Sequence, residues 1–214
     1  LAAAGAFYST GSRPSQEDSD DYLAQVGLAD SPWLRDLGWA EAVSPADVPE
    51  FLARERAENP DFRIVGAREE PGAGRDLAVI TRGSRAGGES LIGLDIASFG
   101  PVATRVFEGP LTRGEPWFAR ISRAAAAVVN QARSALTVAE GDLVSVLPTR
   151  DADGTVNGWL LTRMDADQLL SVDESGRLRV RLENRDAGSG VFSDPVVAES
   201  RRDRVPDGVG VYET

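Results

Sequence analysis

The residue types that most often carry enzyme chemistry are missing from this sequence. It contains no histidine and no cysteine, which removes the commonest general base, thiol nucleophiles and zinc–thiolate sites. Paired carboxylates would still support glycosidase-type chemistry, but among 34 acidic residues such pairs arise by coincidence. No nucleophile, base or metal-ligand set assembles along the chain. We therefore expect that this chain is not an enzyme and that it holds no cofactor.

Two acidic segments have the composition of calcium sites. DADGTVNG (151–158) begins like an EF-hand loop, but the twelfth position counted from Asp151 is Thr162 and not the required glutamate. Its Asp-Gly and Asn-Gly pairs are turn formers, so we predict a hairpin turn. The run from Glu17 to Asp21 fits the solvated first turns of a helix, where the helix dipole favours negative charge. We expect no metal site in either segment.

Glycine-rich and arginine-rich segments have the composition of anion-binding sites. EEPGAGRD and RGSRAGGES lack the P-loop spacing, and all 23 basic residues are arginine, so no lysine completes such a loop. In RLRVRLENR, Arg177, Arg179 and Arg181 share one face of a predicted strand. A solvated edge strand, whose charges discourage aggregation, is favoured over an anion-binding stripe.

Charge and hydropathy exclude two further classes of partner. A net charge of −11 argues against nucleic acid and against docking on anionic lipid. No apolar run approaches the roughly 18 residues needed to span a membrane. The only methionine is Met164, so we expect the chain to be a piece excised from a longer protein.

The first 60 residues read as mainly helical. Residues 1–30 are predicted to form a helix in two parts, with apolar residues at helical spacing in the second. Another helix is predicted to start with Ser44 as its N-cap and Pro45 at its first position, and to end at Asn59. Trp33 and Trp39, which lie between these helices, are expected to be core residues.

Two groups of antiparallel strands follow, separated by glycine-rich turns. The first group comprises residues 62–66, 77–81 and 90–96, and the second comprises 143–147, 158–162, 178–182 and 190–192. Helices are predicted at 101–113 and 165–170, whereas 120–136 is compatible with either helix or strand. Two small antiparallel α+β modules in tandem are the simplest account.

Several segments occur in a familiar order: SPWLRDLGWAEAV, PDFRIV, LIGLDIAS and VNGWLLTRMDADQLL, preceded by LAAAGAFYS and followed by GRLRVRLENRD. Together they resemble the CHASE domain, an extracellular sensor found on histidine kinases and nucleotide cyclases, including plant cytokinin receptors. The resemblance covers nearly the whole chain.

The resemblance implies a long N-terminal helix followed by two tandem PAS-like antiparallel-sheet subdomains. Within a single sensor domain of residues 1–214, it implies a helical region at 1–60, a membrane-distal subdomain at 61–120 and a membrane-proximal one at 121–214. It also implies transmembrane helices on both sides of the domain in the parent protein.

The family binds its ligand in the distal sheet. The residues that this implies as ligand-binding here are Phe62, Ile64, Val79, Thr81, Arg82, Ser84, Phe107, Trp117 and Phe118. Asp95 matches the motif aspartate of the family and is expected to be a structural hydrogen-bond partner. Plant receptors carry an acidic residue where this chain has Gly83 and Ser84, which argues against cytokinin. Arg82 or Arg85 is instead expected to meet a ligand carboxylate or phosphate.

The function implied is an extracytoplasmic small-molecule sensor of a bacterial membrane receptor, homodimeric through the N-terminal helix. It would signal to a cytoplasmic histidine kinase of a two-component system, a diguanylate cyclase or an adenylate cyclase. The alternative is an extracytoplasmic protein-interaction module whose PAS-like sheets bind no small molecule.

Overall fold

The computed structural model describes residues 6–9, 13–25, 31–66, 76–85, 91–98, 107, 117–121, 123–132, 138–170, 181–183 and 196–199. Among them, no helix is long and apolar enough to cross a membrane.

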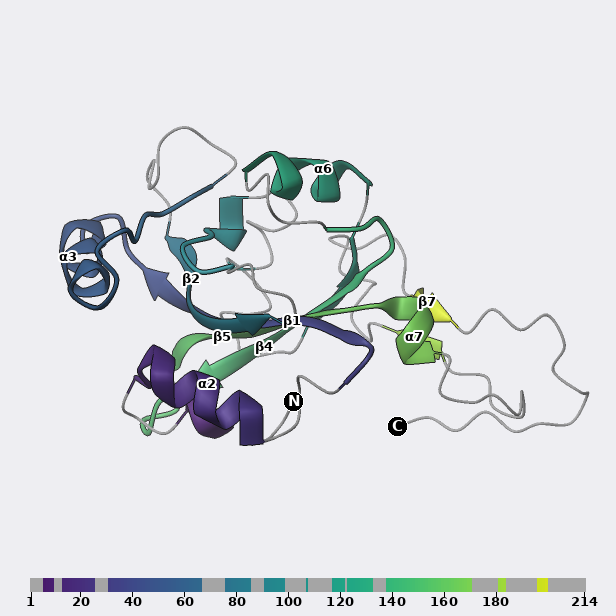
Figure 1. The fold of residues 1–214 in the computed structure, drawn as a ribbon, viewed down its shortest axis with the longest axis horizontal. Helices are drawn as coiled ribbons and strands as arrows, with labels where there is room; N and C mark the ends of the chain where they lie inside the picture. Colours follow the sequence, from purple (N-terminus) through teal and green to yellow (C-terminus); the bar gives the residue numbers. More distant parts are fainter. Residues whose placement is uncertain are drawn as a thin grey trace, which may run out of the picture.

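A five-stranded antiparallel sheet forms the centre of the fold, in the order β2-β1-β5-β4-β3 (Figure 1). Its strands are β1 (Leu34–Val43), β2 (Leu77–Arg85), β3 (Trp117–Arg120), β4 (Leu143–Arg150) and β5 (Val156–Met164). Two short strands, β6 (Arg181–Glu183) and β7 (Val196–Glu199), pair separately. The described helices are α2 (Gln16–Gln25), α3 (Val48–Glu58), the 3₁₀ turn η2 (Ile96–Ser98), α6 (Arg123–Ala132) and α7 (Ala166–Leu170).

Successive residues of a strand point to opposite sides of the sheet, so the sheet has two faces. Both faces are covered by other parts of the chain. Figure 1 shows α6 and α2 on opposite sides of the sheet. On one side Ala40, Ile80 and Trp159 belong to an apolar cluster that packs against Val129 of α6; we call this the α6 face. On the other, Trp39 packs with residues of α2 and the N-terminal segment; we call this the α2 face.

Helix α3 covers the end of the α2 face. Its Phe51 packs against Val43 and Leu77, which pair across β1 and β2. Val43 lies four residues beyond Trp39 on β1, so both side chains point to the same side of the sheet. Trp39 itself is core: its indole Nε1 donates to Thr149 Oγ1 at 3.0 Å, as predicted for a buried tryptophan.

Many of the predicted elements are present. The segment after Asp151 is the turn of the β4–β5 hairpin, with Gly154 at a φ of 82°. Helix α3 ends before Asn59, α7 lies within the predicted 165–170, and residues 123–132 are helix rather than strand. Strands β2, β4 and β5 contain three of the predicted strands.

Other elements differ from the predictions. Residues 34–43 form β1, a central strand that was not predicted. Segments 62–66 and 90–96 form only isolated bridges, at Val65 with Leu94 and at Val79 with Asp95. The helix predicted to start at Ser44 and Pro45 starts instead at Val48, with Asp47 as N-cap, because residues 45–47 form a turn.

The fold class is α+β with an antiparallel sheet, as expected. However, the described residues show neither a long N-terminal helix nor two tandem PAS-like subdomains. Strand β1 pairs with β2 on one side and with β5 on the other. Strands from both sides of the boundary predicted at residue 120 therefore share one sheet. The predicted strand 190–192 and most of the predicted helix 101–113 lie outside the described residues.

Candidate functional site

The residues predicted to bind a ligand do not gather in one place. Phe107 and Trp117 lie against the cluster on the α6 face. Phe62, Ile64 and Val79 belong to the cluster under α3, on the other side of the sheet. The α6 face and the α2 face therefore have to be judged separately as sites.

On the α6 face, three aromatic residues pack in or against one apolar cluster of small and branched side chains. Ala40 of β1 and Trp159 of β5 are opposite each other across the two central strands. Phe107 packs edge-on against the Trp159 ring, with 4.8 Å between centroids and 79° between planes. Trp117 of β3 lies beside the same cluster, opposite Val146. This face thus combines a buried apolar surface with three aromatic rings.

The indole N–H of Trp159 lies on this face. Its Nε1 is buried, the residue is 5% exposed, and the described part of the chain provides no hydrogen-bond partner for it. Buried indole N–H groups usually find an acceptor, and leaving one without an acceptor costs about 1–3 kcal/mol. The sequence analysis did not single out Trp159, which lies in the segment VNGWLLTRMDADQLL, because a strand's alternation does not show whether a buried indole N–H finds an acceptor.

A charged cluster occupies the far end of the α6 face. Arg163 of β5 bonds to Asp36 of β1 through Nε, at 2.5 Å, and to Asp142 through Nη1, at 2.8 Å. All three residues are less than a tenth exposed. Arg163 lies four residues beyond Trp159, roughly 13 Å along the strand. The apolar part of this face is thus separated from its charged end.

The residues under α3 are packed as core. Phe62 is 4% exposed and meets Phe51 edge-on, with 5.7 Å between centroids. Val79 is fully buried in the same cluster, and Ile64 packs at its margin. Phe118 belongs to a further cluster, with Leu143. These contacts are those of core residues, because each side chain packs in or against a hydrophobic cluster.

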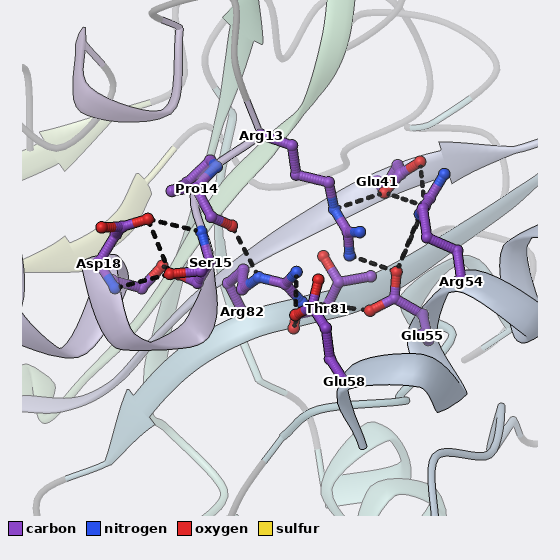
Figure 2. A network of polar contacts seen from close by, with 11 residues as sticks. Arg13, Pro14, Ser15, Asp18, Glu41, Arg54, Glu55, Glu58, Thr81 and Arg82 are labelled. Carbon is purple, nitrogen blue, oxygen red and sulfur yellow. Dashed lines mark hydrogen bonds and ion pairs between the residues drawn. The ribbon is translucent and has the colours of Figure 1, made fainter. Parts of the chain in front are cut away.

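Arg82 is the centre of a buried polar network (Figure 2). Its Nε donates to the Pro14 carbonyl and its Nη1 to the Thr81 carbonyl, both at 2.8 Å. The Nη1 also bonds to Glu55 at 3.1 Å, and the Nη2 bonds to Glu58 at 2.8 Å. The side chain is 3% exposed. A ligand anion would have to displace these protein oxygens.

The network extends from Glu55 to the surface. The second oxygen of Glu55 meets Arg13, which reaches in from the N-terminal segment, and Arg54 at 3.3 Å. Glu41 of β1 joins both of these arginines, at 3.3 Å from Arg13 and 2.7 Å from Arg54. Burial lowers the pKa of Arg13 below its usual value. Three arginines face three glutamates, so the network is neutral overall.

A β-bulge explains why Arg82 faces α2 and α3. Ile80 pairs with Ala40 and Arg82 pairs with Trp39, so that Thr81 has no residue opposite it on β1. Without this extra residue, Arg82 would follow Ile80 onto the α6 face. The Oγ1 of Thr81 is buried, and the described residues offer it no hydrogen-bond partner. Ser84 of β2 pairs with Leu37 of β1. The side chains of Ser84 and Arg85 lie outside the described part of the structure.

Asp95 has the structural role that was expected. Its Oδ1 accepts from the backbone N–H of Ala78 at 3.1 Å, and the residue is 2% exposed. Its own N–H donates to the Val65 carbonyl at 2.8 Å. The carboxylate therefore ties the segment before η2 to β2. Among the residues that the structure describes, no group of three or more carboxylates is placed to hold a metal ion.

Comparison with known proteins identifies the family. A search among curated proteins finds no match. The family model of the CHASE domain matches residues 12–192, which is well over half of the chain and includes the whole five-stranded sheet. The chain therefore belongs to the CHASE domain family, whose members are extracellular sensor domains of signalling receptors.

Proposed function

We propose that this CHASE domain is the extracytoplasmic small-molecule sensor of a bacterial membrane-bound receptor. It relays ligand binding to a cytoplasmic output domain, a histidine kinase or a nucleotide cyclase. The parent protein is integral to the membrane, and the domain works as a homodimer through its N-terminal helical region. The five-stranded sheet is the PAS-like sheet that holds the ligand.

The observation that carries this proposal is the composition of the α6 face. Phe107 and Trp117, two of the predicted ligand residues, lie there beside Trp159, whose buried N–H has no acceptor in the described part of the chain. Binding sites for small molecules are mostly apolar surfaces with a few polar groups that fix orientation. On the α3 side, the guanidinium of Arg82 is already bonded to protein oxygens.

Relay to the rest of the receptor follows from the bulge in β2. Ile80 faces the ligand side, whereas Arg82, two residues later, holds the Pro14 carbonyl and Glu55 on the other side. A ligand that binds one arrangement of the sheet more tightly shifts the population towards it. The Arg82 network then carries that shift to the segment that precedes α2.

Thermal shift against a metabolite library tests the sensing function. A ligand that binds only the folded chain raises its melting temperature, by an amount that grows with concentration. A receptor in which this domain controls a reporter kinase tests the relay. We expect Arg82→Gln to keep ligand binding but to lose most of the output response.

The alternative is an interaction module with no small-molecule ligand. The extent to which buried side chains already fill the α6 face favours it. If no metabolite raises the melting temperature and a partner protein changes the reporter output, the interaction module replaces the sensor.

A further inference from the structure

The indole of Trp159 has the chemistry of a ligand-orienting group. Its cross-strand neighbours are Ala40 on β1 and Pro148 on β4, and neither side chain has a hydrogen-bond acceptor. Among the described residues its aromatic contact is with Phe107, and an aromatic face is a much weaker acceptor than a carbonyl oxygen. The surface of the Nε1 atom is closed to bulk water. The donor is therefore ready for an acceptor that the described part of the chain does not supply.

The charge distribution on this face selects the class of ligand. The cluster around Trp159 consists of apolar residues, including Ile80, Val146 and Leu161. Among the described side chains of the sheet, the two buried arginines are both occupied: Arg82 faces α2 and α3, and Arg163 is held by two aspartates. An anion placed near Trp159 would thus lose its hydration with no described cation to replace it.

We propose that the α6 face binds an uncharged, mainly apolar ligand whose carbonyl oxygen or aromatic ring nitrogen accepts a hydrogen bond from Trp159 Nε1. This inference rests on the proposed sensing function and specifies its ligand. It replaces the earlier expectation that Arg82 meets a carboxylate or phosphate. Trp159 orients the acceptor, while the ring of Phe107 packs against the apolar part of the ligand.

Three probes of similar size separate the possible chemistries. Acetophenone is uncharged and has a carbonyl acceptor, benzoate is an anion, and ethylbenzene has no acceptor. They are titrated into the ¹⁵N-labelled 214-residue chain, whose four tryptophans give separate indole N–H resonances. The variant Trp159→Phe assigns the resonance of Trp159 and removes the donor while keeping an aromatic ring.

We expect acetophenone to move the Trp159 indole resonance and to bind about tenfold more weakly to Trp159→Phe, since a lost hydrogen bond is worth roughly this factor. Ethylbenzene should bind both proteins equally. The matched control is Trp39→Phe, which removes the indole N–H that donates to Thr149 on the opposite face. It should leave the acetophenone Kd within about twofold. Circular dichroism verifies that both variants fold.

Two results would overturn the inference. One is benzoate binding more tightly than acetophenone at the α6 face. The other is acetophenone leaving the Trp159 resonance of the unmodified chain in place, whether it binds elsewhere or not at all. A metabolite that raises the melting temperature through other contacts would then leave the sensing function standing. If no metabolite and no probe binds, the sensing function fails as well.

Discussion

Replacing Arg82 by methionine removes the centre of the buried network while keeping a long apolar side chain. Arg82 and Glu55 are 3% and 2% exposed, so water does not compensate either charge once its partner is gone. The variant leaves the carbonyls of Pro14 and Thr81 without this donor. Breaking a buried ion pair by removing one partner costs about 3–5 kcal/mol. We take about 3 kcal/mol, because Arg13 still contacts Glu55.

Arg54→Met is the matched control, since it makes the same substitution in the same network. The Arg54 side chain is 43% exposed and pairs mainly with Glu41. Exposed ion pairs contribute about 0–1 kcal/mol because water and salt screen them. For a chain of this size, 1 kcal/mol corresponds to roughly 2–4 °C in Tm. We therefore expect Arg82→Met to lower the Tm by about 6–12 °C and Arg54→Met by less than about 4 °C.

Thermal and urea unfolding at about 0.15 M salt, followed by circular dichroism, measure both variants. The double variant Arg82→Met/Glu55→Met should be more stable than the sum of its single variants predicts, because no uncompensated glutamate remains at the centre. An equal fall in Tm for Arg82→Met and Arg54→Met would refute the view that burial makes Arg82 the key residue of this network.

Three further predictions concern other parts of the sheet and its helices. Gly158→Ala should cost about 1–3 kcal/mol in urea unfolding, because its Cβ would lie 2.5 Å from the Ala40 carbonyl oxygen and 2.7 Å from the Trp39 ring; unchanged stability would contradict this packing. Trp39→Phe should lower the free energy of unfolding by about 1 kcal/mol more than its smaller ring explains, because the hydrogen bond to Thr149 is lost. A double-mutant cycle with Thr149→Val measures the energy of that hydrogen bond. Backbone N–H groups at the start of α7 hold the pKa of Asp165 below its usual value, so its stabilisation is complete above about pH 3.9 and is lost as the pH falls through the lower folded-state pKa. Urea midpoints between about pH 5 and pH 2.5 should therefore fall less in Asp165→Asn than in the parent chain, and parallel curves would rule this contribution out.

The elements predicted well are those whose signals are local. The Asp-Gly turn after Asp151 and the helix end at Asn59 depend on a few neighbouring residues, and both are confirmed. Strand β1 was missed for the converse reason. Its residues alternate between large and small rather than between apolar and polar, because both of its faces are buried. Alternation of size is a packing signal that becomes visible only when the neighbouring strands are known.

The candidate site shows the same division. The sequence indicated that Phe107 and Trp117 belong to a ligand face, and they lie together on the α6 face. Val79 and Arg82, which the resemblance also implies as ligand residues, lie on the opposite side of the sheet. A bulge of one residue at Thr81 makes the difference for Arg82, because a shift of one position turns a strand side chain to the other face.

The amino-acid sequence by itself determined the absence of histidine and cysteine chemistry, the acidic charge and the resemblance to the CHASE domain, because these depend only on which residues occur and in what order. Tertiary structure alone decided which cations are free to meet a ligand. Arg82 is bonded to Glu55 and Glu58 of α3, residues more than 20 positions away in the chain, and these contacts exist only once α3 packs beside β2. The same packing buries the N–H of Trp159 without an acceptor among the described residues, because its position between β1 and β4 is set only when the sheet forms.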